Sequence, residues 1–111
     1  MVKNYVPDKG DLVWVTLDPS LGHEQKGRRP VLVLSTREYN KVSGLCIAVP
    51  VTSHKKGYPF EYEFAGKNLS GVVLADQLRS ISFKARKAEK VEKIKDEVLQ
   101  GILAKIKVLF F

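Results

Sequence analysis

Short apolar segments separated by turn residues follow one another through most of this chain, and they restrict the possible folds more than any other feature. Segment 10–17, GDLVWVTL, is apolar on both faces after a Gly-Asp turn signal, which predicts a β-strand. Segments 31–35 (VLVLS) and 45–51 (LCIAVPV) are rich in β-branched residues and too short for helices, so they predict two further strands. Pro50 cannot donate to a sheet and should lie near the end of its strand or at a bulge.

The remaining segments predict a half-exposed strand, two short strands and one long helix. In segment 60–64, FEYEF, aromatic residues alternate with glutamates, and segment 72–83, VVLADQLRSISF, contains two short strands that meet near its Ala-Asp-Gln. Segment 84–95 is highly charged and has room for one more edge strand. From Asp96 onward apolar residues recur at helical spacing, with Asp96 as the expected cap and Gly101 weakening the helix by about 1 kcal/mol.

These segments predict a mainly β fold: a small antiparallel barrel or sandwich of roughly five to seven strands, with a short turn or helical piece at 37–42 and a C-terminal α-helix. The length of 111 residues suits a single domain over 1–111. The apolar face of the C-terminal helix is wide. It could be covered entirely by the barrel, or it could leave area for a second subunit in a homodimer.

Composition limits the partners and the compartment. The net charge of +7 favours a polyanionic partner, either a nucleic acid, an acidic protein or an anionic membrane surface. Cys46 is the single cysteine, so neither an intramolecular disulfide nor a thiolate zinc cluster can form, as is usual in a reducing cytoplasm. We expect neither export nor membrane insertion, because the chain shows no signal-peptide pattern and no run of about 20 apolar residues.

Polar residues gather at the predicted strand ends. We find no metal-binding motif and no glycine-rich phosphate loop, so no metal or nucleotide cofactor is expected. If the three polar loops converge at one end of the barrel, they form a basic surface suited to RNA, on which Trp14, Tyr58 and Phe83 could stack against bases. The loop residues are Glu24, Arg28 and Arg29, then Thr52, His54, Lys55 and Lys56, then Asp76, Gln77, Arg79 and Ser80.

RNA carries its own nucleophile, the 2′-hydroxyl. A metal-free enzyme therefore needs one group to accept that proton, one to protonate the leaving 5′-oxygen, and cations around the phosphorane. Glu24, Arg29, Thr52 and Lys56 are of suitable types, although arginine is a poor acid or base near neutral pH.

Each of these residues also has a purely structural interpretation. Arg28 and Arg29 could pair with Glu24 on the surface, an arrangement worth about 0–1 kcal/mol. Thr52 could be a turn hydroxyl that bonds local backbone. Asp76 could be a cap or the ion-pair partner of an arginine. Trp14 could belong to the core, because a tryptophan in an apolar strand is more often buried there than exposed for base stacking.

Three long blocks closely resemble the MazF/PemK/Kid family of toxin endoribonucleases from bacterial type II toxin–antitoxin modules, most of all its MazF members. They are YVPDKGDLVWVTLDPSLGHEQKGRRPVLVLS, CIAVPVTSHKKGYPFE and GVVLADQLRSISF, and they occur in the family's order. The resemblance implies an SH3-like barrel and a cytoplasmic homodimer. It also implies metal-independent, sequence-specific cleavage of single-stranded mRNA, which leaves a 2′,3′-cyclic phosphate and a 5′-hydroxyl and inhibits translation. An acidic antitoxin would then lie across the RNA groove.

The resemblance also implies site residues. Arg29 of GRRP and Thr52 of VPVT match catalytic positions of the family, and Glu24 of EQKG matches an acidic position that affects activity. Some relatives use the Asp and Arg of the ADQLRS block instead, and several have tryptophan where this chain has Phe83. The candidate RNA-binding residues are Trp14, Arg28, Lys56, Asp76, Gln77, Arg79 and Arg86.

Two other classes of function remain open on the sequence. SH3-like barrels often bind without catalysing a reaction, and the gyrase-poisoning CcdB toxins are thought to share the fold. An RNA-binding module would bind RNA with a steep salt dependence but never cut it.

Overall fold

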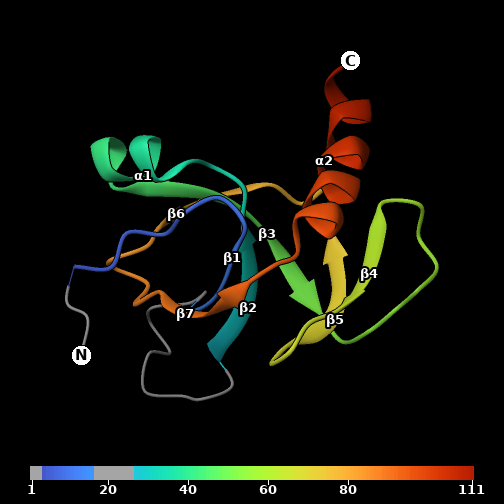
Figure 1. Ribbon diagram of the computed structural model, residues 1–111, viewed down its shortest axis with the longest axis horizontal. Helices are drawn as coiled ribbons and strands as arrows, with labels where there is room; N and C mark the ends of the chain where they lie inside the picture. The colour runs from blue at the N-terminus through green and yellow to red at the C-terminus, as the bar shows by residue number, and fades with distance from the viewer. Residues whose placement is uncertain (1–3, 17–26) are drawn as a thin grey trace.

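Seven antiparallel strands and two helices make up the protein, as a computed structural model shows over residues 4–16 and 27–111 (Figure 1). The sheet order is β4-β5-β3-β2-β1-β7, and β6 pairs with β3 outside this path. The element bounds are β1 Asp11–Thr16, β2 Arg28–Val33, α1 Arg37–Ser43, β3 Leu45–Thr52, β4 Glu61–Ala65, β5 Ser70–Leu74, β6 Arg79–Ser82, β7 Glu89–Lys93 and α2 Asp96–Phe110. This confirms the mainly β fold, the short helical piece and the C-terminal helix.

Strand β3 is the centre of the sheet because it pairs with three others. Its first half, Leu45–Ala48, lies against β6, and its end, Val51 and Thr52, lies against β5. Strand β2 pairs with the middle of β3, where Pro50 stands opposite Val31, two residues before the end of the strand. One strand that changes its partner along its length curls the sheet, and the result is a half-barrel.

Apolar residues cover both faces of the central strands, as the sequence of segment 10–17 predicts. One core cluster, containing Leu12 and Leu32, packs against α2 through Leu99, Ile102 and Ile106. The other lies on the opposite face, where its members are Val13, Val15, Val31, Val33, Cys46, Ala48, Ile81 and Phe83. The strands that carry the site are therefore held on both sides.

Two aromatic side chains lie elsewhere than expected. Trp14 is 37% exposed between the fully buried Val13 and Val15, so the interpretation of Trp14 as a core residue is wrong. Phe83 is only 9% exposed and belongs to the second core cluster, so it is not available to stack on a base, and that expectation is wrong too.

Two further expectations about α2, one on its N-terminus and one on Gly101, differ from the structure. The N-cap is Lys95, without a side-chain cap bond, and Asp96 is the first helical residue, so the prediction of Asp96 as the cap is off by one position. Packing explains why a glycine stands at position 101 of the helix. A Cβ there would overlap the Tyr62 ring of β4, so the glycine permits the close approach of helix and strand.

The charged segment 84–95 contains one more edge strand, β7, as the sequence suggested. Strand β7 pairs with β1, with a bulge between Leu12 and Val13. The turn before β7 is tied to β1 by the Thr16 N–H, which donates to the Arg86 carbonyl at 2.9 Å. A second bond of 2.9 Å, from the Ala88 N–H to the Phe83 carbonyl, closes the turn itself. Lys87 in this turn has φ of +54°, a conformation that is strained for a residue other than glycine.

Candidate nucleic-acid interface

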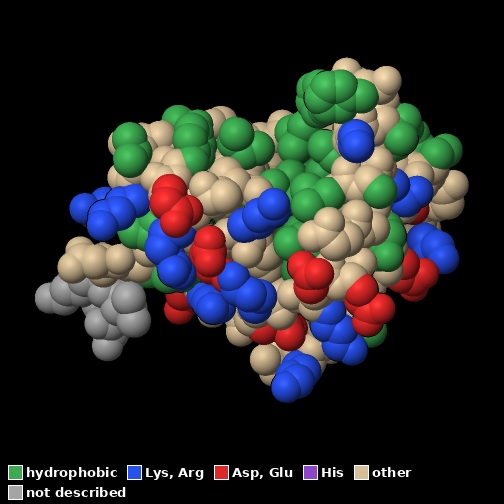
Figure 2. Space-filling model, turned by 45° about the horizontal axis from the view of Figure 1, so that its top comes forward, with side chains coloured by type: hydrophobic (Ala, Val, Ile, Leu, Met, Phe, Trp, Pro, Cys, Tyr) green, Lys and Arg blue, Asp and Glu red, His purple; other side chains and the backbone are tan. Residues whose placement is uncertain are grey.

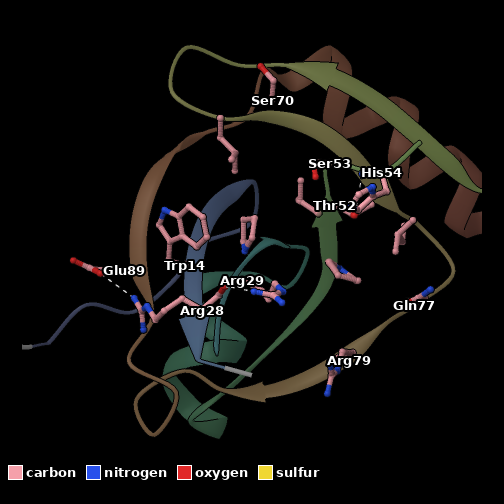
Figure 3. A pocket seen from close by; sticks show the side chains of 15 residues that line it. Trp14, Arg28, Arg29, Thr52, Ser53, His54, Ser70, Gln77, Arg79 and Glu89 are labelled. Atoms are coloured by element: carbon pink, nitrogen blue, oxygen red, sulfur yellow. Dashed lines mark hydrogen bonds and ion pairs between the residues drawn. The ribbon is translucent and has the colours of Figure 1, made fainter. Parts of the chain in front are cut away.

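An open groove of about 930 Å³ crosses the sheet where β1, β2, β3 and the turn after β5 meet (Figure 3). It brings together side chains from distant parts of the sequence, including three arginines. The lining residues are Trp14, Arg28, Arg29, Pro30, Pro50, Val51, Thr52, Ser53, His54, Leu69, Ser70, Leu74, Gln77, Arg79 and Glu89. Six of the residues in the three polar loops do converge on the groove, namely Arg28, Arg29, Thr52, His54, Gln77 and Arg79, and Trp14 of β1 lies beside them.

Arg29 lies in the middle of the groove. Its strand position is fixed by pairing opposite Val15, and the next residue, Pro30, pairs opposite Trp14. One guanidinium nitrogen of Arg29 donates to the Arg28 carbonyl at 2.9 Å. Figure 3 shows the guanidinium directed into the groove, on the side toward Thr52. The strand thus sets the position of this charge.

Thr52 ends β3 at the wall of the groove. Its Oγ1 accepts the N–H of His54 at 3.2 Å, so the interpretation as a turn hydroxyl holds. The hydroxyl still has a proton to donate, and the residue lines the groove. Gly71 of β5 allows the neighbouring strand to approach, because a Cβ there would lie 2.7 Å from the Thr52 carbonyl oxygen.

Arg28 lies at one rim and is held by three acceptors. It donates to Thr16 Oγ1 at 3.0 Å, to the Lys87 carbonyl at 3.1 Å and to Glu89 Oε1 at 2.9 Å. Arg28 thus forms a surface ion pair, but with Glu89 rather than with a residue of its own loop. Glu24, the expected partner and a candidate catalytic residue, lies outside the described residues.

Gln77 and Arg79 lie at the other end of the groove, as Figure 3 shows. Gln77 is in the turn between β5 and β6, where its N–H donates to the Leu74 carbonyl at 3.1 Å. Arg79 begins β6 opposite Ala48 and is exposed. Within ranges 4–16 and 27–111 its side chain has no hydrogen-bond or ion-pair partner.

Three candidate residues, Lys56, Asp76 and Arg86, are not part of the groove lining. The backbone N–H of Lys56 donates to Glu61, in the loop between β3 and β4. Asp76 Oδ2 accepts the Tyr58 hydroxyl at 2.7 Å, and this bond raises the pKa of Tyr58 above its ordinary value. Arg86 donates to the Thr16 carbonyl at 2.9 Å.

No local signal in the sequence predicts three lining residues, Leu69, Ser70 and Glu89. Leu69 ends the β4–β5 turn, Ser70 is the first residue of β5, and Glu89 starts β7 within a charged run. Only the pairing of β7 with β1, at Trp14 opposite Glu89, brings that carboxylate to the site.

The β4–β5 turn is itself held by a carboxylate. Glu92 of β7 accepts the backbone N–H groups of Asn68 at 2.8 Å, Leu69 at 2.9 Å and Lys67 at 3.1 Å. These bonds, that of Asn68 foremost, hold the pKa of Glu92 below its ordinary value. Glu92 therefore fixes the wall from which Leu69 and Ser70 face the groove.

The groove's side chains suit a phosphodiester substrate. Three arginines against one glutamate make it positive, and Trp14 offers an exposed aromatic surface at the same place. No group of three or more metal-ligating His, Cys, Asp or Glu side chains occurs in the described part of the chain. Burial raises the pKa of the Cys46 thiol to about 11, so this thiol is an unsuitable nucleophile. Among the described helices, none has the length and apolar character to cross a membrane.

Comparisons with known proteins agree with one another. The family model described as "PemK-like, MazF-like toxin of type II toxin-antitoxin system" matches residues 8–110. The chain is 52% identical to the endoribonuclease toxin MazF of Escherichia coli strain K12 over 98% of each chain, and 34% identical to Escherichia coli endoribonuclease PemK over 92% of this chain and 80% of that one.

Solved structures give the same result. A crystal structure of MazF from Deinococcus radiodurans is 50% identical, with a TM-score of 0.84 over 96% of this chain and 97% of that one. A MazE–MazF crystal structure from the same organism is 45% identical, with a TM-score of 0.84 over 96% of both chains. These findings favour the ribonuclease over the gyrase poison and the non-catalytic module. By sequence and by fold, the chain belongs to the PemK-like, MazF-like toxins of type II toxin–antitoxin systems.

Proposed function

We propose that this toxin, an endoribonuclease of the MazF-like family, binds single-stranded mRNA in the groove and cleaves it at Arg29 and Thr52. The observation that carries the proposal is the groove itself, which gathers three arginines, a hydroxyl and an exposed tryptophan from separate segments. Arginine forks onto phosphate oxygens, and an exposed indole offers a stacking surface for a base.

The reaction we propose uses the 2′-hydroxyl of RNA as its nucleophile. The 2′-oxygen attacks the adjacent phosphorus, the bond to the 5′-oxygen breaks, and the products are a 2′,3′-cyclic phosphate and a 5′-hydroxyl. Arg29 supplies positive charge where the phosphorane develops its negative charge. The proton leaves the 2′-hydroxyl and another reaches the 5′-oxygen, and the proposed set for these transfers is Thr52, Glu24 and Arg29.

The other groove residues hold the strand on both sides of the cleaved bond. Arg28 and Arg79 contact phosphates at opposite rims, Trp14 stacks on a base, and Gln77 bonds a base edge or sugar. Lys56, Asp76 and Arg86 act from beside the lining. Asp76 and Arg86 have partners within the chain, through which they support the groove walls, and Lys56 adds positive charge in the loop between β3 and β4.

We propose an acidic antitoxin segment as the protein partner of the groove. The solved relatives include a complex described as MazE–MazF, and this chain carries a net charge of +7. An acidic segment across the arginines would exclude RNA by occupying the same charges. Because mRNA is in the cytoplasm, we place the activity there.

A homodimer is the proposed assembly. The C-terminal end of α2 and the outer side of α1 expose large apolar side chains, and Figure 2 shows hydrophobic side chains collected along this edge, with charged ones below it. Val108 is 68% exposed and Phe110 63%, which is unusual for such residues in a helix that packs on a core. The residues concerned are Tyr39, Val42, Val108, Leu109, Phe110 and Phe111.

Sedimentation tests the assembly. We expect the wild type to sediment as a dimer at micromolar concentration and the Val108→Glu/Phe110→Glu double variant as a monomer, because buried carboxylates oppose association. Lys107→Ser, on the same turn, serves as the control and should remain dimeric. A monomeric wild type would refute this assembly.

Cleavage assays test the catalytic proposal. Purified protein with excess EDTA is incubated with a labelled mixed-sequence RNA and with its 2′-deoxy analogue, and the fragment ends are mapped. We expect cuts in RNA only, with 5′-hydroxyl ends, and a loss of about 100-fold or more in rate on Arg29→Ala. Arg37→Ala, an exposed arginine on α1 away from the groove, is the matched control. Equal activity of the two variants, or cleavage of the 2′-deoxy analogue, would contradict the proposal.

A further inference from the structure

The Arg28 side chain is held by two acceptors other than Glu89. Its Nη1 donates both to Thr16 Oγ1, a residue only 5% exposed, and to the Lys87 carbonyl. The Lys87 carbonyl is presented by a turn closed through Arg86 N–H to Ser82 O and Lys87 N–H to Lys84 O. These contacts fix the plane and position of the guanidinium without any help from Glu89.

Glu89 occupies the remaining side of that guanidinium. Its Oε1 lies 2.9 Å from Arg28 Nη2, and the side-chain exposures of the pair differ sharply, 22% for Arg28 and 78% for Glu89. An ion pair with one partner so exposed adds little to stability. Among the described residues Glu89 is also the one carboxylate in the groove lining, and Figure 3 shows the pair at the rim beside Trp14.

We infer that Glu89 is an internal competitor of RNA: its carboxylate holds the place on Arg28 that a backbone phosphate takes when RNA binds. This inference rests on the proposed function of the groove. A carboxylate and a phosphate both accept from a guanidinium at similar distances, so one can replace the other at Nη2. Thr16 and Lys87 keep Arg28 in place during the exchange, and the exposed Glu89 side chain moves into solvent.

The exchange sets the toxin's affinity for its substrate. In the free protein Glu89 neutralises Arg28 and adds a negative charge at the rim, which repels the approaching RNA backbone. Each phosphate that binds there first displaces the carboxylate. Glu89 thus weakens binding of every RNA sequence by a similar factor, since phosphate contacts carry no base information.

The test compares RNA affinity of the full chain and its Glu89→Gln variant by fluorescence anisotropy. The probe is a labelled RNA with 2′-deoxyribose at the mapped cleavage position, so that it binds without being cut. We expect Glu89→Gln to bind about fivefold more tightly at low salt, with the gain shrinking as salt screens the charges. Glu63→Gln is the matched control, since Glu63 pairs with Lys55 on the exposed face of β4, outside the groove lining.

A double-variant cycle shows whether the effect acts through Arg28. In an Arg28→Gln background, Glu89→Gln should change affinity by less than about twofold, because there is no guanidinium left to compete for. An equal gain in both backgrounds, an equal gain from Glu63→Gln, or no gain at all overturns the inference. If Arg28→Gln fails to fold, the salt dependence of the Glu89→Gln gain decides, and a gain that persists at high salt counts against competition.

Arg29→Ala separates this inference from the proposed function. If Arg29→Ala loses RNA binding and Glu89→Gln gains none, the groove is the RNA site and only the competitor role is wrong. If Arg29→Ala binds RNA as the wild type does, the groove is not the RNA site and both proposals fall together.

Discussion

The two rims of the groove hold their arginines in opposite ways. At the rim formed by β1, β2 and β7, Arg28 has a hydroxyl, a carbonyl and a carboxylate as acceptors. At the rim formed by the start of β6, Arg79 is exposed and has no partner among the residues the structure describes. The protein itself holds the first arginine in one position, whereas the second keeps its side-chain freedom until a ligand binds it. One groove thus combines a fixed and an adaptable arginine.

The largest expected effect concerns the fixed rim. Arg28→Ala should lower the free energy of unfolding by about 2 kcal/mol, because it removes three hydrogen bonds and leaves the buried Thr16 hydroxyl without its donor. Urea denaturation measures this. A change as small as that of Arg79→Ala would show that the two rims do not differ in this way.

The adaptable rim should respond in binding and hardly at all in folding. Arg79→Ala should weaken RNA binding by up to about tenfold and reduce the slope of log K against log salt by about 1, while the unfolding free energy changes by less than about 0.5 kcal/mol. Anisotropy titrations over a range of salt concentrations provide the measurement. A marked loss of stability would mean that Arg79 is also a structural residue.

A third wall of the groove, the β4–β5 turn, is also held by a charged side chain, and the pH dependence of stability tests this. The folded-state pKa of Glu92 is lowered, so its contribution to stability is present above the ordinary pKa of about 4.5 and is lost as pH falls through the lower folded value. Glu92→Gln should cost about 1 kcal/mol at pH 7 and less at pH 3. Urea titrations of both proteins at the two pH values would detect this, and a cost independent of pH would exclude the charged form as its origin.

The smallest effect tests how the turn presents its carbonyl to Arg28. Lys87→Gly should raise the unfolding free energy by about 0.5 kcal/mol, because glycine accepts φ of +54° without strain, in part offset by its greater freedom when unfolded. Lys87→Ala removes the same charge but keeps the Cβ, and should give no gain. Thermal unfolding of the three proteins makes the comparison, and equal gains would trace the effect to charge.

The strands of this fold were predictable because alternation and turn residues are local signals. The positions of Arg29 and Thr52 in the groove were expected from the family resemblance, and the structure places both there without testing their chemistry. What the sequence could not provide were contacts between distant segments. Glu89 of β7 meets Arg28 of β2 because both strands pair with β1, one on each side of it, and the spacing of charges in segment 84–95 does not indicate this contact.

The same limit explains the misjudged aromatic residues and the glycine. Trp14 lies in β1 and Phe83 directly follows β6, both in apolar stretches of sequence, and only the packing of the sheet decides that Trp14 is exposed and Phe83 buried. Helix propensity, a local property, predicts that Gly101 destabilises the helix. Its favourable effect is the close packing of the helix against Tyr62, which is far away in the sequence. Predictions failed where packing between elements outweighed local preference.

The exposed tryptophan also makes the groove an optical reporter. Trp14 is the only tryptophan among the 111 residues, so all indole emission of the protein comes from the place where Arg28 and Arg29 lie. Since it is partly exposed in the folded state, a dissolved quencher can reach it, and anything that covers the groove should shield it. Occupancy of the groove, by RNA or by an acidic peptide, can therefore be followed in real time in the unlabelled protein.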